Sequence, residues 1–99
     1  MKNDRLKGKV SIVTGAASGI GLQTLELFAS QGAAVVAIDI LSLTNELSEK
    51  FKACGNIKYL QLDISLEKNW AQIVDYIRSK HKKLDVLINN AGINGYDKN

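Results

Sequence analysis

The residues best suited to chemistry form the segment Thr14-Gly-Ala-Ala-Ser-Gly-Ile-Gly21, which follows an apolar run and leads into a segment of helical period. Gly15 permits a tight turn after a strand, Gly19 lets the backbone approach a ligand, and Gly21 lets helix and strand pack closely. The start of the helix presents free backbone N–H groups and the positive end of its dipole. The segment therefore predicts a binding site for a diphosphate.

Two other interpretations of this glycine-rich segment fit its residues less well. A P-loop requires a Lys-Ser or Lys-Thr pair after its last glycine, and nothing here supplies one. An ordinary turn between a strand and a helix would also use glycine. Three glycines and the hydroxyl of Ser18 at one junction favour phosphate binding over that alternative.

A carboxylate, Asp39, ends the next apolar run. It lies 18 residues beyond Gly21, close to the interval at which a dinucleotide-binding fold carries its ribose-binding acid. A carboxylate there would accept both ribose hydroxyls and repel a 2′-phosphate, and neither Ser18 nor Ile40 offers a compensating cation. The sequence predicts NAD(H) over NADP(H), while an Asp after a strand is also a common turn residue.

Four apolar runs are expected to form the strands that position these groups. Three of them are rich in β-branched residues and mostly unalternated, as is typical of strands buried on both faces: Val10–Val13, Ala33–Ile38 and Leu84–Ile88. The run Ile57–Leu62 alternates more, so we expect it at the edge of the sheet.

Three segments of helical period separate these runs. The first is expected from Gly19 to Gln31, with Gly32 as a left-handed cap. A shorter second helix ends at Gly55 and carries an apolar residue at every fourth position: Leu43, Leu47 and Phe51. The third is expected to have Ser65 as its N-cap and an apolar stripe of Leu66, Trp70, Ile73, Val74 and Ile77.

The alternating order of strands and helices predicts an α/β fold over residues 1–99, a Rossmann-like doubly wound parallel sheet of strand order 3-2-1-4. Right-handed crossovers would place the first two helices on one face and the third on the other. The chain has no proline and no composition shift that would mark a linker, so we expect no second domain.

Composition excludes several classes of function. The net charge of +3 has its densest basic stretch at residues 78–83, which closes an expected helix and lacks aromatics for stacking bases. No apolar run approaches the roughly 20 residues that span a bilayer, and no signal-peptide core follows the N-terminus. The single cysteine, Cys54, fits a reducing cytosol. We expect a cytoplasmic protein without nucleic-acid, membrane or metal binding.

Three motifs together resemble those of the short-chain dehydrogenase/reductase family. The glycine segment matches that family's cofactor signature, Leu62-Asp-Ile64 resembles its adenine-contacting pair, and Asn89-Asn-Ala-Gly92 is similar to its N-N-A-G element. The resemblance covers about residues 7–92. It implies the NAD(H)-binding N-terminal portion of an oxidoreductase that acts on alcohol or carbonyl groups.

The resemblance also implies roles for single residues. Ser18 and Ile20, beside Gly19, would contact the pyrophosphate and the nicotinamide side, and Asp39 would contact the adenosine ribose. The other implied positions are Asp63 and Ile64 at the adenine, Asn90, Ala91 and Gly92 along the groove between adenosine and nicotinamide, and Asn89 as a tie between strands.

The family's catalytic serine and its Tyr-x-x-x-Lys pair lie beyond a fifth strand, whereas this chain ends at Asn99. Tyr96 and Lys98 are too close together to share a helix face in that way. We therefore assign no catalytic residue and expect the chain alone to be inactive, with a sheet truncated after its fourth strand. Its open edge is expected to pair with a complementary C-terminal segment or with a second copy.

Two classes of function remain open. The chain is either part of an oxidoreductase completed by further polypeptide or a non-catalytic dinucleotide-binding or protein-interaction module. A methyltransferase with a similar β-α-β start fits the glycine spacing and the N-N-A-G element poorly. The substrate is not predicted, because the loops that would bind it are not among these motifs.

Overall fold

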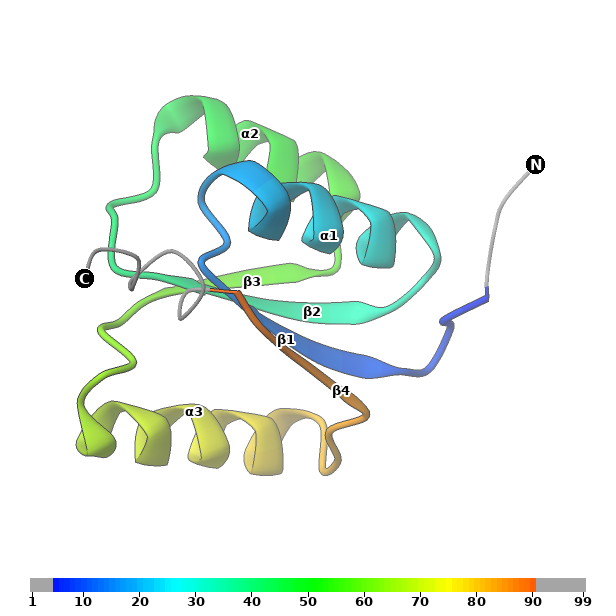
Figure 1. The fold of residues 1–99 in the computed structure, drawn as a ribbon. Helices are drawn as coiled ribbons and strands as arrows, with labels where there is room; N and C mark the ends of the chain where they lie inside the picture. The colour runs from blue at the N-terminus through cyan, green and yellow to red at the C-terminus, as the bar shows by residue number, and fades with distance from the viewer. Residues whose placement is uncertain (1–4, 91–99) are drawn as a thin grey trace.

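The computed structural model describes residues 5–90, which form a four-stranded parallel sheet with helices on both faces (Figure 1). At its centre lie β1 (Val10–Thr14) and β2 (Ala34–Asp39), and its edges are β3 (Ile57–Gln61) and β4 (Val86–Asn89). The observed order, β3-β2-β1-β4, confirms the predicted Rossmann-like topology. It also confirms the edge position expected for the more strongly alternating run.

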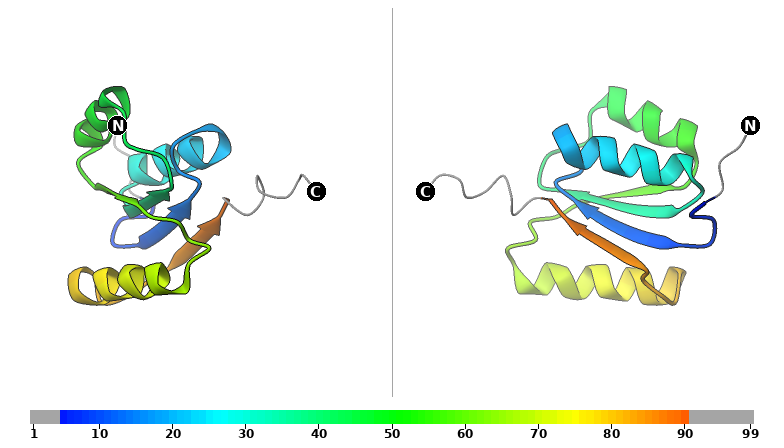
Figure 2. Two further views of the ribbon diagram at one scale, coloured as in Figure 1. Left: turned by 90° about the vertical axis from the view of Figure 1, so that its left-hand side faces the viewer. Right: turned by 45° about the vertical axis from the view of Figure 1, so that its right-hand side comes forward.

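The two layers of helices follow from the handedness of the crossovers. The helices α1 (Gly19–Ser30) and α2 (Asn45–Cys54) cover one face, and α3 (Glu67–Lys80) covers the other (Figure 2). The chain steps from β1 to β2 to β3 in one direction and then returns past both central strands to β4, so a right-handed connection carries α3 to the opposite face. Every helix within residues 5–90 is too short or too polar to cross a bilayer.

Each face of the sheet has its own apolar core, because buried parallel strands send alternate side chains to opposite faces. In β1, Val13 packs under α1, whereas Ile12 packs against α3. Leu25 of α1 and Ile73 of α3 are fully buried at the centres of these two clusters. Burial of one such side chain contributes about 1.5–3 kcal/mol to the stability of the fold. This packing fixes the helices against the sheet whose strand ends carry the predicted site.

The end of α1 follows the predicted glycine signal. Gly32 has φ +95°, the left-handed conformation expected of a C-terminal cap. The N–H of Gly32 donates to the carbonyl of Ala29, and that of Ala33 to the carbonyl of Phe28, both at 3.1 Å. These are the two hydrogen bonds of a Schellman motif, and they aim the chain directly into β2.

Two predicted helix starts were wrong. Leu43 precedes α2, because the Thr44 hydroxyl accepts a hydrogen bond from the Leu47 N–H at 3.1 Å and caps the helix one residue later. Ser65 is not the N-cap of α3; that position is held by Leu66. The Ser65 hydroxyl instead donates to Asp63 Oδ1 at 2.7 Å, a local side-chain bond that competes with helix capping.

Candidate functional site

A cleft of about 160 Å³ opens at the carboxyl ends of β1, β2 and β3, where ligands bind in doubly wound sheets. Its walls come from three separate parts of the chain: Thr14, Gly15, Ile38, Asp39, Ile40, Leu62, Asp63 and Ile64. The structure thus brings Gly15, Asp39 and the Asp63–Ile64 pair together. Pockets that enclose whole small molecules measure about 300–1,000 Å³, so this cleft has room for only part of such a molecule.

The glycine loop leads from β1 to the N-terminus of α1. Gly15 has φ +64°, which lets the backbone turn sharply off the strand. Ser18 occupies the N-cap in an extended conformation and makes no side-chain capping bond. The first N–H groups of α1 have no partner within the helix, so they are available to an anion. Ser18 and Ile20 are both exposed at this mouth, Ile20 by 69%.

Gly21 is the position where the loop and the helix come closest. A Cβ placed there would lie 2.0 Å from the carbonyl oxygen of Gly15 and 2.9 Å from Nδ2 of Asn90. The Asn90 side chain is buried and donates to the same Gly15 carbonyl at 3.5 Å. Asn90 therefore supports the loop from the end of β4, while its contact with a cofactor stays a prediction.

The remaining N-N-A-G residues divide into two groups. Asn89 ties β4 to β1 as predicted, since its Oδ1 accepts a hydrogen bond from the Thr14 hydroxyl at 3.1 Å. Ala91 and Gly92 lie outside the described residues. Their predicted place along the cofactor groove stays a prediction.

Asp39 connects two backbone segments at the cleft. Its Oδ2 accepts a hydrogen bond from the Ala17 N–H in the glycine loop at 2.9 Å, and its Oδ1 accepts one from the Leu41 N–H at 3.0 Å. The bond to Leu41 is that of a turn residue, whereas the bond to Ala17 spans 22 positions of sequence. Because each carboxylate oxygen has two lone pairs, both oxygens can still accept ribose hydroxyls.

The side of the cleft formed by Asp63 and Ile64 is held by groups from α3 that the sequence did not point to. The buried Asn69 side chain donates to the Asp63 carbonyl at 2.9 Å, and the Trp70 indole N–H donates to the Ile64 carbonyl at 2.8 Å. Trp70 was expected only as core, yet a partly buried indole needs an acceptor. The hydroxyl and N–H of Ser65 donate to Asp63 and lower the pKa of its carboxyl.

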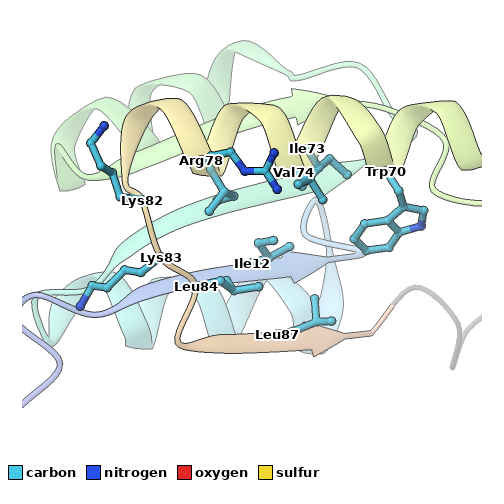
Figure 3. Close-up of a pocket in the computed structure, with 10 residues that line it drawn as sticks. Ile12, Trp70, Ile73, Val74, Arg78, Lys82, Lys83, Leu84 and Leu87 are labelled. Atoms are coloured by element: carbon cyan, nitrogen blue, oxygen red, sulfur yellow. The ribbon is translucent and has the colours of Figure 1, made fainter.

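A second hollow, of about 260 Å³, lies between α3 and the strands β1 and β4 (Figure 3). Its floor is apolar and includes Ile12, Ile73 and Leu87, the last of which is 49% exposed. In Figure 3, Trp70 marks one end of this groove and Lys82 and Lys83 lie at the other. Among residues 5–90, β4 pairs with β1 alone, so its outer edge is open.

Comparisons with known proteins agree with this geometry. A family model described as "short chain dehydrogenase" matches residues 9–99. The chain is 47% identical over 92 residues to "Tropinone reductase-like 1" from Erythroxylum coca, a match covering 90% of this chain and 32% of that protein. It is 37% identical over 92 residues to "NAD-dependent glycerol dehydrogenase" from Listeria innocua, covering 93% and 36% respectively.

The fold itself matches solved members of the same family. Hydroxysteroid dehydrogenase from Escherichia coli superposes with a TM-score of 0.77 at 36% identity, over 89% of this chain and 38% of that one. The chain spans about a third of the length of the curated relatives it matches. Since the family match takes in nearly all of its residues, the chain belongs to the short-chain dehydrogenase family of oxidoreductases.

Proposed function

We propose that this chain binds NAD(H) and forms the dinucleotide-binding part of an oxidoreductase that acts on alcohol or carbonyl groups. One observation carries the proposal: the carboxylate of Asp39 is bonded to the glycine loop at Ala17 and lines the same cleft as Gly15. The proposed diphosphate loop and the proposed ribose acceptor therefore lie at one cleft, where a single dinucleotide would contact both. The Asp63–Ile64 pair closes the adenine end of that cleft.

The same carboxylate supports a preference for NAD(H). Two unit charges 4 Å apart interact by about 4 kcal/mol at an effective dielectric of 20, and by less in a cleft open to water. The residues within 5–90 that line the cleft include no lysine or arginine to offset this repulsion. We therefore expect a 2′-phosphate beside Asp39 to weaken binding by about tenfold or more.

The chemistry is divided between the cofactor and the protein. When bound, NAD(H) supplies the hydride, while the residues of this chain hold its diphosphate, ribose and adenine. The groups that move a proton to or from the substrate oxygen would come from the further two thirds of the relatives' length. The names of the relatives, a tropinone reductase-like protein and a glycerol dehydrogenase, support an alcohol or carbonyl substrate.

Titration calorimetry with the intact chain tests the proposed binding. NAD⁺ is expected to give saturable heat with one site, and NADP⁺ to bind about tenfold more weakly or worse, because of the charge on Asp39. In parallel, NAD⁺ should raise the melting temperature by mass action. Absence of heat with both dinucleotides at millimolar concentration would contradict the proposal, and equal affinities would contradict the role of Asp39.

We also propose that the groove beside α3 and the free edge of β4 are covered by polypeptide that completes the family fold. A further right-handed crossover from β4 would place its helix on the α3 face, above Leu87. That helix would run antiparallel to β4, so its negative C-terminal end would lie near Lys82 and Lys83. The apolar floor of the groove and its two lysines therefore both suit such a helix.

Sedimentation velocity tests this second proposal. The probe is the part of the Erythroxylum coca relative that lies outside the matched segment, added to the intact chain. We expect a one-to-one complex, weakened at least tenfold by Leu87→Glu because a charge would be buried, and unaffected by Leu27→Glu on the exposed side of α1. A dimer of the chain alone that Leu87→Glu abolishes would assign the groove to a second copy instead.

A further inference from the structure

We infer that the Tyr59 hydroxyl and the Gln61 amide, both on the edge strand β3, are positioning groups that set the NAD(H) over NADP(H) selectivity of the cleft. The inference rests on the proposed function and concerns the short segment between β2 and α2. Neither side chain lines the cleft itself. Both act on the backbone that follows Asp39.

The two side chains hold consecutive carbonyl groups. The Tyr59 hydroxyl donates to the carbonyl of Leu41, and Gln61 Nε2 donates to the carbonyl of Ile40 at 3.2 Å. The N–H of Leu41 in turn donates to Asp39 Oδ1. The Leu41 residue is therefore held at both of its backbone groups, by Asp39 on one side and by Tyr59 on the other.

This segment needs such support because its own side chains provide little. Ile40 and Leu41 are 60% and 54% exposed, and the chain there has neither helical nor strand bonding. Ile40 nevertheless lines the cleft next to Asp39. In dinucleotide folds the region beside the ribose-binding acid is where a 2′-phosphate would have to be accommodated. When Ile40 and Asp39 are fixed there, the apolar side chain offers no compensating charge to that phosphate and the carboxylate repels it.

The packing of Tyr59 holds its hydroxyl in place as a hydrogen-bond donor. Its ring packs against Phe51 of α2, with ring centroids 6.1 Å apart, and borders the core cluster on that face. Partial burial and, secondarily, the charge of Asp39 raise the pKa of Tyr59 to about 12. The hydroxyl therefore stays protonated, and stays a donor, throughout the neutral and mildly alkaline range.

Tyr59→Phe tests the inference, because it keeps the ring on Phe51 and removes only the hydroxyl. We expect the ratio of the NADP⁺ to the NAD⁺ dissociation constant to fall about three- to tenfold, as one net hydrogen bond allows, with a smaller fall for Gln61→Ala. Backbone hydrogen exchange of the ligand-free protein should show faster exchange at the Leu41 N–H. The matched control is Tyr76→Phe on α3, which should change neither quantity.

The outcomes separate this inference from the proposed function. If the unsubstituted chain selects NAD⁺ and Tyr59→Phe leaves the ratio and the Leu41 exchange unchanged, the inference fails while the proposed function stands. If Tyr59→Phe weakens both dinucleotides equally, the hydroxyl has a merely structural role and the inference also fails. If the unsubstituted chain binds neither dinucleotide, both are overturned.

Discussion

Replacing Gly21 with alanine is expected to abolish dinucleotide binding and to destabilise the protein. The added Cβ would lie 2.0 Å from the Gly15 carbonyl oxygen and 2.8 Å from its carbon, both backbone atoms that no rotamer change can move. Either the loop opens or the start of α1 shifts, and each displaces the amides that would hold the diphosphate. We expect a loss of about 1–3 kcal/mol in unfolding free energy, measured by urea denaturation, and binding too weak to detect by calorimetry.

A second glycine provides the control for this substitution. Gly55 follows α2 with φ +83°, and a Cβ there would meet no atom within 4 Å. Gly55→Ala should therefore cost about 1–2 kcal/mol through backbone strain alone, with the NAD⁺ affinity of the folded protein unchanged. If Gly21→Ala bound NAD⁺ like the unsubstituted chain, the loop would not be the diphosphate site.

Replacing Asp39 with asparagine is expected to remove the discrimination between the two dinucleotides. Asparagine keeps the size of the side chain but has no charge. Ala17 and Leu41 donate to different oxygens of Asp39, and the amide nitrogen that replaces one of these oxygens cannot accept, so one of the two bonds is lost. Hydrogen bonds to a charged group contribute about 1.5–3 kcal/mol, so NAD⁺ affinity should fall by about tenfold to a hundredfold. The affinity for NADP⁺ should fall much less, because the repulsion of its 2′-phosphate disappears as well.

Competition between the two dinucleotides, followed by calorimetry, measures this change directly. Asp75→Asn removes a carboxylate from the exposed surface of α3 and serves as the charge-matched control. It should leave the affinity ratio unchanged. A ratio that Asp39→Asn also leaves unchanged would show that the carboxylate acts as a turn residue and does not contact the ribose.

The parts of the fold that the sequence predicted are those where several local signals agree. Two β-branched runs, an amphipathic segment and Gly32 all indicated the same β-α-β unit, and the handedness of crossovers then assigned each helix to a face of the doubly wound sheet. The predicted start of α3 was wrong because the Ser65 side chain had two possible hydrogen-bond partners. Its hydroxyl bonds to Asp63, two residues earlier, and a capping preference cannot decide between such neighbours.

The site was predictable to the extent that its groups belong to linear motifs. The glycine loop and Asp39 have a recognisable spacing, whereas Tyr59 and Gln61 depend on how β3 is aligned with β2. In the structure Gln61 pairs with Asp39 and Tyr59 with Ala37, which brings both side chains to the segment after β2. One residue of slip would turn them to the other face, and no motif in the sequence fixes that register.

An NMR titration of the ¹⁵N-labelled chain with NAD⁺ shows whether the glycine loop, Asp39 and the Asp63–Ile64 pair bind one ligand. We expect the amides of the glycine loop, of residues 39–41 and of residues 63–64 to shift together with one dissociation constant, while those of Leu84 and Leu87 in the groove beside α3 stay unchanged. Shifts confined to that groove, or separate dissociation constants for the loop and for Asp39, would show that these groups do not form one dinucleotide site.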